Sequence, residues 1–368
     1  MMETINSSSY NFITTTQPPG DGYDDFDKYA DLFKSLHIMS MIVYSLVFVL
    51  GVVGNGVVIW VTGFKMKKTV NTVWILNLAV ADFLFTAFLP LKVTHLALDF
   101  HWPFGNFMCK LHTTVSLLNM FTSIYLLMVI SVDRCVSVVW PVWAQNHRNI
   151  RKASWVSLGV WVVASILSVP YFVFRDTEVD PEDRFTFCFD NFALSDDYET
   201  PSVNQLRQSR NEALVVVQFF LKFLIPFTVI VSCYAIIIHR LRRNRTLASQ
   251  TSRPFKIIVA IIITFFVCWA PLHIMGLIHL VKFSSDEPNN KLEFVISVSI
   301  PIATNLAFLN SCLNPLLYVF MGQDFKDEVR KSILKALESA FQEEKTRSTY
   351  ATKTGESKER SAADDTEV

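Results

Sequence analysis

Charged residues are scarce in this chain of 368 residues, at 18%, whereas hydrophobic residues make up 51%. The signatures of common catalytic sites are absent too. The sequence has no GxGxxG run, no His/Cys cluster with metal-ligand spacing and no nucleophile elbow. We therefore expect no enzyme and no tightly bound cofactor, and no nucleic-acid partner is expected either.

A cleavable signal peptide is also missing. Residues 1–35 are polar and contain no apolar stretch followed by small residues, which a secretory cleavage site needs. We expect the first apolar segment to direct the chain to the membrane instead.

The apolar residues are gathered into seven blocks, each long enough to cross a bilayer, which takes about 20 residues. This pattern predicts an all-α membrane protein, a bundle of seven transmembrane helices. Prolines interrupt five blocks and should kink their helices. The blocks are 38–63, 71–98, 106–139, 153–174, 212–239, 255–282 and 293–320, and the prolines are Pro90, Pro170, Pro226, Pro271 and Pro315.

The distribution of Lys and Arg predicts the orientation of this bundle. The loops after the first, third and fifth blocks are basic, whereas the N-terminal tail and the long loop after the fourth block are acidic. Because basic loops stay in the cytoplasm, we expect an extracellular N-terminus and a cytoplasmic C-terminus. The predicted parts are an acidic extracellular tail (1–37), a seven-helix domain (38–320), an amphipathic helix on the inner membrane face (321–340) and a disordered tail (341–368).

Both tails carry short motifs. Asn6-Ser7-Ser8 is a glycosylation sequon, so we expect a glycan on Asn6. The ending Thr366-Glu367-Val368 is a weak signal for a PDZ domain, which captures a C-terminal carboxylate.

Two of the six cysteines, Cys109 and Cys188, lie on the predicted extracellular side. A disulfide is favoured in an oxidising compartment, and it would tie the long outer loop to the third helix. The alternative is two free thiols.

Asp82 lies in the middle of the second block, where an ionised carboxylate needs a cation or several donors. Other mid-block polar residues are candidate partners, and an oxygen-rich group of this kind suits sodium or a proton. The alternative is a hydrogen-bonded structural cluster without an ion. The candidates are Asn55, Asn119, Ser123, Asn310 and Asn314.

Asp133 and Arg134 end the third block at the predicted cytoplasmic edge. They are either an interface pair that reaches for the headgroups or a latch that releases Arg134 to a partner. Trp269 stands two residues before Pro271, where a small change of its rotamer would swing the end of a kinked helix.

Lys222 lies four residues before Pro226, too deep in the fifth block to reach the membrane surface. We expect it to face the bundle and hold an acidic group of the protein or of a ligand. Lys92 and His95, in the outer part of the second block, are either ligand contacts or structural residues.

Five motifs together resemble the rhodopsin class of G-protein-coupled receptors over residues 38–335. They are Gly54-Asn55, Leu78-Ala79-Val80-Ala81-Asp82, Asp133-Arg134-Cys135, Cys268-Trp269-Ala270-Pro271 and Asn314-Pro315-Leu316-Leu317-Tyr318. Cys135 departs from the usual Tyr, and Cys at this position is common in the chemoattractant branch. A retinal protein would need a lysine in the middle of the seventh block, where only Lys291 lies nearby, at the edge.

Within this class the chain is similar to the chemerin (chemokine-like) receptors and the formyl peptide receptors. The segments that carry this similarity are 141–148, 64–71, 254–259 and 174–177. Chemokine receptors proper are disfavoured, because no cysteine occurs in 1–37 or 283–292 for their additional disulfide.

The resemblance implies a plasma-membrane receptor for a chemoattractant peptide or small protein, coupled to inhibitory G proteins and regulated by arrestin. Formyl-peptide-type, anaphylatoxin-type and non-signalling scavenging receptors are the alternatives. Chemerin receptors hold a ligand carboxylate partly with an arginine, where this chain has Gln218. The implied ligand residues are Lys92, His95, Ser116, Arg175, Gln218, Lys222, Trp269 and His273. The implied switch residues are Asp133, Arg134, Trp269, Pro271, Asn314, Pro315 and Tyr318.

Overall fold

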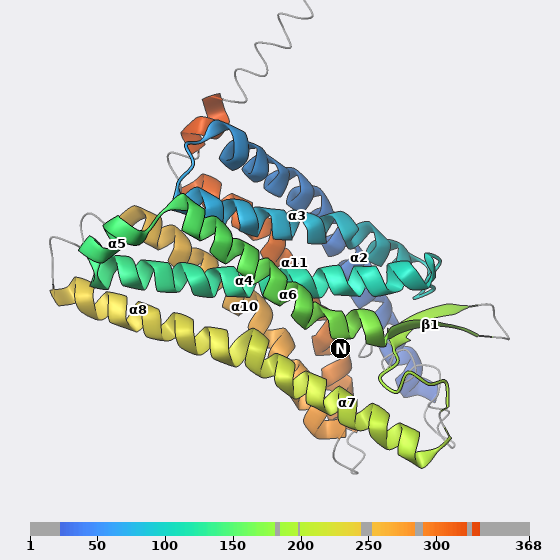
Figure 1. Ribbon diagram of the computed structural model, residues 1–368. Coiled ribbons are helices and arrows are strands. Elements are labelled where there is room, and N and C mark those ends of the chain that lie inside the picture. The colour runs from blue at the N-terminus through green and yellow to red at the C-terminus, as the bar shows by residue number, and fades with distance from the viewer. Residues whose placement is uncertain are drawn as a thin grey trace, which may run out of the picture.

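The computed structural model describes residues 23–180, 185–197, 199–243, 252–283, 290–321 and 326–331. Within these residues, seven helical segments are long and apolar enough to cross a membrane. They form one bundle (Figure 1), which confirms the predicted all-α seven-helix fold. The segments are Tyr29–Lys65, Val70–Ala97, Gly105–Val139, Ile150–Phe174, Pro201–Arg243, Ile258–Val281 and Phe294–Tyr318.

The helices follow one another with short connections. Two of them contain a wide π-helical turn, η1 in the first and η2 in the fifth. The elements are α2 (Tyr23–Trp60), η1 (Val61–Lys65), α3 (Val70–Ala97), α4 (Gly105–Val139), α5 (Pro141–His147), α6 (Ile150–Phe174), β1 (Arg175–Val179), β2 (Thr186–Asp190), α7 (Pro201–Phe219), η2 (Phe220–Leu224), α8 (Ile225–Arg243), α10 (Ser252–Phe283) and α11 (Asn290–Met321).

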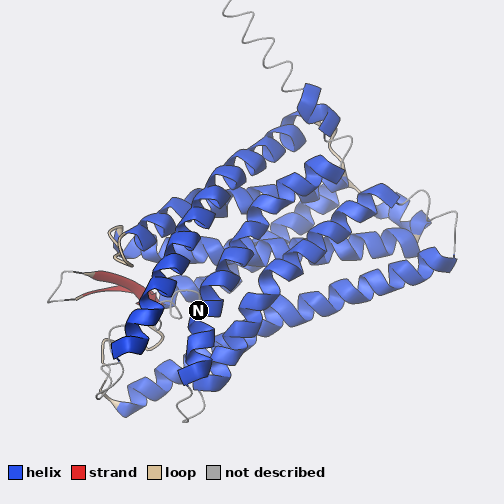
Figure 2. Cartoon of the chain, turned by 180° about the vertical axis from the view of Figure 1, so that it is seen from behind, coloured by secondary structure: helices blue, strands red, loops and turns tan. Residues whose placement is uncertain are grey.

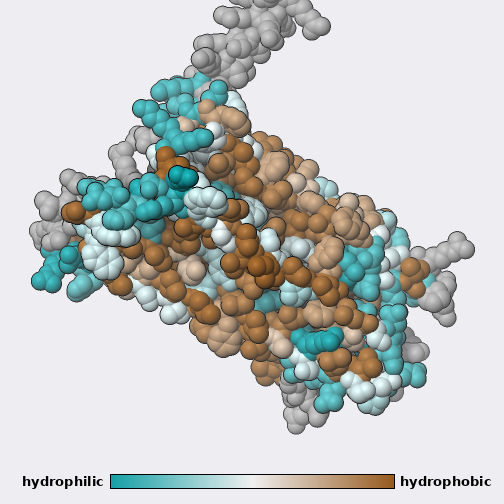
Figure 3. All heavy atoms as spheres, in the orientation of Figure 1, coloured by the Kyte–Doolittle hydropathy of each residue, from teal (hydrophilic) through white to brown (hydrophobic). Residues whose placement is uncertain are grey.

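Helix α4 lies at the centre of the bundle, in contact with α3, α6 and α8. Apolar side chains cover the middle of the face shown in Figure 3, and hydrophilic ones gather mainly at its two ends. This distribution is the one that a bilayer requires, because its hydrocarbon core gives polar groups no water.

Two helices begin more than ten residues before their apolar blocks. Helix α2 starts at Tyr23 instead of residue 38, and the fifth helix starts at Pro201 instead of residue 212. Residues 23–37 of the predicted tail are therefore helical. Hydropathy marks only the part of a helix that lies in hydrocarbon, whereas the helix continues wherever it finds packing. Tyr29 supplies such packing, with its ring 4.5 Å from that of Phe294.

The remaining boundaries agree in part with prediction. The five predicted prolines lie in helices, and Pro301 inside α11 is a sixth that the prediction omitted. Residues 326–331 are helical, and Val329 packs against the core. Of the predicted helix 321–340, the structure describes only residue 321, which ends α11, and residues 326–331. The predicted tail 341–368 lies outside the described residues.

Strands β1 and β2 pair antiparallel, with Arg175 opposite Asp190 and Thr177 opposite Cys188. The sequence predicted only a long loop here. The hairpin projects from one end of the bundle (Figure 2), which we call the hairpin end. Helix α5 marks the opposite end, which we call the α5 end.

Gly51 marks the closest approach of α2 to α3. A Cβ atom on Gly51 would lie 2.4 Å from Thr86 Cγ2 and 2.9 Å from Thr86 Cβ. Overpacking of this kind costs about 1–3 kcal/mol. We therefore expect Gly51→Ala to lower the melting temperature of the detergent-purified protein and Thr86→Ala to restore part of the loss. Gly159→Ala is the matched control, because nothing lies within 4 Å of its Cβ position. Equal melting of the Gly51 and Gly159 variants would contradict the close contact.

Candidate functional site

A cavity lies beneath the hairpin, and its empty space, together with the open solvent at its mouth, is about 1060 Å³. Its walls come from α3, α4, α6, β1, the fifth helix, α10 and α11, so most of the bundle contributes to it. Most of the lining is apolar, including Phe85, Met120, Phe219, Leu272 and Phe308. A largely apolar cavity with a few convergent polar groups is typical of a ligand site.

Lys222 is one of three cationic side chains that line the cavity, with Lys92 and Arg175. It lies in the wide turn η2, where Ile225 N–H donates to Phe220 O, one residue beyond the α-helical partner. The Lys222 ammonium donates to Gln218 Oε1 at 2.5 Å and lies over the ring of Phe121, 4.9 Å from its centroid. Among the described residues no carboxylate forms an ion pair with Lys222, although the side chain is buried.

Three further polar atoms of the cavity have no hydrogen-bond partner in the described part of the chain. They are Gln218 Nε2, Trp269 Nε1 and His273 Nε2. Buried polar atoms are nearly always satisfied in proteins. Together with Lys222, these atoms give the cavity an excess of donors, which an anionic or carbonyl-rich ligand would satisfy.

Seven of the eight predicted ligand residues line this cavity. They are Lys92, Ser116, Arg175, Gln218, Lys222, Trp269 and His273. His95 is outside the lining among the described residues, because its ring packs against Phe100 and Trp102.

Arg175 has a structural role that the sequence did not reveal. Its guanidinium forms a buried ion pair with Asp190, with Nη1 2.9 Å from Oδ1, and donates to Cys188 O at 3.1 Å. The predicted disulfide joins Cys109 to Cys188 and so fixes β2 to the start of α4. Ion pair and disulfide together hold the hairpin over the cavity.

The rim of the cavity is acidic. Glu178, Asp196 and Glu199 are exposed around the hairpin and the loop that follows it. Hydrogen bonds from Thr200, first from its side chain and then from its amide, hold the pKa of the exposed Asp197 carboxyl below its ordinary value. The hairpin and the loop that follows it therefore carry exposed carboxylates, whereas the cavity carries the buried Lys222.

A second polar group lies deeper, between α2, α3, α4 and α11. Asn314 Nδ2 donates to Asp82 Oδ2 at 2.8 Å, and Ser123 Oγ donates to Asn119 Oδ1 at 3.3 Å. Ser311 connects the group, because its hydroxyl accepts from Asn119 at 3.2 Å and its carbonyl accepts from Asn55 at 2.9 Å. The sequence prediction missed Ser311, although it lies between the predicted residues Asn310 and Asn314.

Four oxygens of Asp82 and its predicted partners have no hydrogen-bond partner among the described residues. They are Asp82 Oδ1 and the amide oxygens of Asn55, Asn310 and Asn314. Carboxylate and carbonyl oxygens suit hard cations, so the residues fit a sodium ion. No group of three or more His, Cys, Asp or Glu side chains that could hold a metal occurs in the described ranges.

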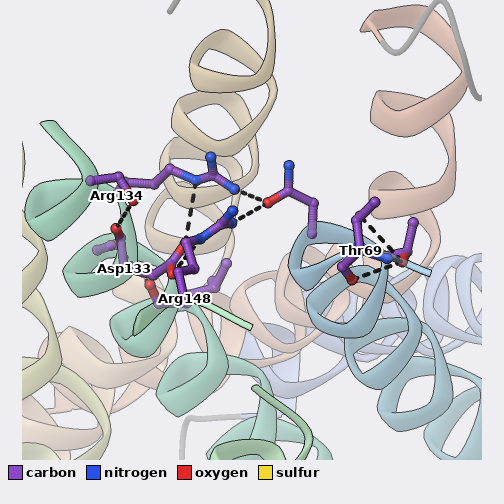
Figure 4. A network of polar contacts seen from close by, with 9 residues as sticks. Thr69, Asp133, Arg134 and Arg148 are labelled. Carbon is purple, nitrogen blue, oxygen red and sulfur yellow. Dashed lines mark hydrogen bonds and ion pairs between the residues drawn. The ribbon is translucent and has the colours of Figure 1, made fainter. Parts of the chain in front are cut away.

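A third polar group lies at the α5 end. Asp133 Oδ1 accepts from Arg148 Nε at 2.8 Å, and Asp133 Oδ2 lies 3.9 Å from Arg134 Nε. Both guanidiniums also donate to Asn71 Oδ1, at 2.6 Å from Arg148. Figure 4 shows Arg134 and Arg148 reaching past Asp133 from different segments. The predicted pair of Asp133 and Arg134 is thus part of a group of four.

Two more of the predicted switch residues, Tyr318 and Pro315, lie in the helix bundle. Tyr318 is buried in the core, and Pro315 packs where a Cβ on Gly54 would meet it at 3.1 Å. Asn6 and the segment 366–368 lie outside the described residues, so their expected glycan and PDZ contact stay predictions.

Known proteins share this architecture. A family model described as "7 transmembrane receptor (rhodopsin family)" matches residues 54–318. Chemerin-like receptor 1 of Rattus norvegicus is 46% identical over 322 residues, which cover 86% of this chain and 84% of that protein. The C3a anaphylatoxin chemotactic receptor of Oncorhynchus mykiss is 39% identical, covering 94% of this chain and 91% of that one. N-formyl peptide receptor 3 of Homo sapiens is 39% identical, covering 84% and 86%.

Both the match over more than half of the chain and the identity to these relatives show the family. Members of this family are multi-pass plasma-membrane receptors that couple an extracellular ligand to a G protein, and they are not enzymes. The chain belongs to the rhodopsin family of seven-transmembrane receptors and is of the chemoattractant-receptor type.

Proposed function

We propose that the chain is a chemoattractant receptor of the chemerin-receptor type, with a peptide or small protein as its ligand, and that it signals through the inhibitory class of G proteins. The observation that carries this proposal is the buried Lys222 with its unsatisfied neighbours at the floor of the cavity. The similarity to chemerin-like receptor 1 supports the choice of ligand class.

The ligand in this proposal enters with a carboxylate first. Lys222 already has one partner, Gln218 Oε1, which is neutral, so its positive charge is uncompensated by the described residues. A carboxylate from the ligand would accept from the Lys222 ammonium and from Gln218 Nε2 or His273 Nε2. Hydrogen bonds between charged groups are stronger than neutral ones, above all where water is excluded.

The acidic rim would select the rest of the ligand. Glu178, Asp196 and Glu199 attract a basic surface during the encounter. In this arrangement the hairpin end is extracellular and the α5 end cytoplasmic, as the charges of the loops predict. Exposed Lys67, Lys68 and Arg151 at the α5 end agree with that orientation.

The switch between the two ends would be a shift of population. Trp269 lines the cavity, lies two residues before the kink at Pro271 and stacks on Phe265, with ring centroids 5.9 Å apart. A ligand that presses on Trp269 would favour the state in which the α5 end of α10 swings outward and Arg134 leaves its group with Asp133 and Asn71. Such a ligand must bind the open state more tightly than the closed one.

Sodium would bind at the deeper polar group and favour the closed state. Asp82, Asn119, Ser123, Asn310 and Asn314 would hold it, with Ser311 as a further neighbour. Asp82 Oδ1 and the free amide oxygens point to this role. The ion would compensate the charge of the buried Asp82 carboxylate, to which the neutral Asn314 amide donates.

Further partners follow from parts of the chain that the structure does not describe. Phosphorylated Ser and Thr residues in 341–368 would recruit arrestin, and the end of the chain would bind a PDZ domain. A glycan on Asn6 would lie outside the cell. Lipids would cover the exposed apolar faces of the helices.

The similarity to the C3a anaphylatoxin chemotactic receptor favours a second candidate, an anaphylatoxin-type receptor, whose ligand would also be a basic protein domain. To separate the candidates, we would measure inhibition of cyclic-AMP formation in transfected cells by C-terminal peptides of chemerin, by anaphylatoxin C-terminal peptides and by formylated peptides. We expect the chemerin peptides to be the most potent. Ligand binding without any change in cyclic AMP would indicate a scavenging receptor and contradict the proposal.

Lys222→Ala should weaken the response to the most potent peptide of this panel by roughly 30-fold, because a buried charge pair loses about 2 kcal/mol. Amidating the C-terminus of that peptide should cause a similar loss in the wild type and little further loss in the variant. Lys110→Ala is the control, since this lysine lies at the hairpin end outside the cavity lining. If amidation cost no potency, Lys222 would not be the carboxylate partner.

The sodium proposal predicts that the agonist affinity of the wild type falls as sodium replaces choline at a constant ionic strength of about 0.15 M. Asp82→Asn should abolish this dependence and Ser123→Ala should weaken it. Ser131→Ala is the matched control, because Ser131 is buried in the same helix and donates to Leu127 O, away from Asp82. An unchanged sodium dependence in Asp82→Asn would show that the ion binds elsewhere or not at all.

A further inference from the structure

One carboxylate faces two guanidiniums at the α5 end of the bundle. Asp133 lies in the direct ion pair with Arg148, at 2.8 Å, whereas its neighbour in sequence, Arg134, lies 3.9 Å away. All three side chains are largely shielded, with 13% of Asp133, 15% of Arg134 and 29% of Arg148 exposed. A single negative charge is thus shared unequally between two positive ones, and Arg148 has the better position.

The unequal sharing leaves two complementary atoms apart. Asp133 Oδ2 and Arg134 Nε are both buried, and neither has a hydrogen-bond partner in the described part of the chain. Their separation of 3.9 Å exceeds the usual hydrogen-bond range of about 2.7–3.2 Å. Arg134 Nε and Asp133 Oδ2 therefore face one another without forming a hydrogen bond, while Arg148 binds the other carboxylate oxygen, Asp133 Oδ1.

Asn71 is the residue that directly holds Arg134. Its amide oxygen Oδ1 accepts from the Arg134 guanidinium and also from Arg148 Nη2. Asn71 is neutral, so this contact retains Arg134 without compensating its charge. Asn71 Oδ1 is within hydrogen-bond distance of Arg134, whereas the Asp133 carboxylate is not.

Two helix ends place these groups. Asn71 follows Val70, the first residue of α3, where Thr69 and Thr72 form a reciprocal capping box. Arg148 ends α5, with its amide donating to Ala144 O at 2.8 Å. The cap at Thr69 is visible beside the arginines in Figure 4. Because backbone hydrogen bonds fix both ends, the competition for Asp133 is set by the fold rather than by flexible loops.

We propose that Arg148 is a positioning residue that diverts Asp133 from Arg134, so that the neutral side chain of Asn71 is the principal restraint on Arg134 in the resting receptor. Removing Arg148 lets Asp133 Oδ2 close on Arg134 Nε and tightens the resting state. Removing the Asn71 amide frees Arg134 and loosens it. An ordinary latch, in which every contact of the group stabilises the resting state, predicts the same sign for both changes.

The test measures agonist-free nucleotide exchange on a purified inhibitory-class G protein, with membranes matched for receptor number by labelling of a surface tag. Asn71→Ala should raise exchange by about 3-fold to 10-fold. Adding Arg148→Gln to Asn71→Ala should remove at least half of that rise. Arg148→Lys, which keeps the charge beside Asp133, should leave the rise in place. Arg151→Gln is the matched control for loss of an exposed positive charge in the same region.

The Asp133→Asn variant distinguishes the proposal from the alternative that Arg148 contacts the G protein directly. With Asp133→Asn there is no carboxylate to return to Arg134, so Arg148→Gln should have no further effect on exchange. An equal fall in the Asp133→Asn background would make Arg148 a G-protein contact and overturn the proposal. A rise on adding Arg148→Gln to Asn71→Ala would make Arg148 part of an ordinary latch and overturn it too.

The experiment relies on coupling to the inhibitory class, which is part of the proposed function. If neither Asn71→Ala nor Asp133→Asn raises exchange on that G protein, the same variants are assayed on stimulatory and phospholipase-activating G proteins. A rise there places the error in the coupling class and keeps the test of Arg148 intact. No rise on any G protein, with normal surface labelling, would show that Asn71 does not restrain Arg134.

Discussion

The hydrogen bond from Asn314 to Asp82 joins α11 to α3 in the middle of the bundle, and the arrangement of the other helices depends on it. In lipid, helices gain little from burying apolar surface against one another, so close packing and polar contacts decide how they fit. The polar group around Asp82 extends to α2 and α4 through Ser311. The contact of Gly51 with Thr86 brings α2 within reach of it.

Helix α4 connects this group to both ends of the receptor. It starts at the disulfide of Cys109, contributes Ser116 to the cavity and Asn119 to the deeper polar group, and ends next to Arg134. Ser116 and Arg134 are separated by about 27 Å along the helix, at 1.5 Å per residue. A ligand in the cavity therefore influences Arg134 only through movement of whole helices.

The sequence predicted the contacts that the bilayer makes necessary for polar residues inside the membrane. A carboxylate such as Asp82 inside a span must find polar partners, and the structure brings Asn119, Ser123 and Asn314 to it. The sequence did not predict contacts between residues whose types are common at their positions in the chain. Arg148 is one more basic residue of a loop, and its bond to Asn71 crosses 77 positions of the chain. The hairpin and the pair of Arg175 with Asp190 likewise depend on tertiary placement.

The buried cation in the cavity explains affinity better than it explains activation. A carboxylate that reached Lys222 would compensate its charge in the open and the closed state alike, and a ligand that binds two states equally shifts neither. The preference for the open state must come from contacts that change between them. Trp269 and His273 lie on α10 on either side of Pro271, and each has an unsatisfied nitrogen facing the cavity. Lys222 would therefore determine how tightly a ligand binds, and these two residues how far it activates the receptor.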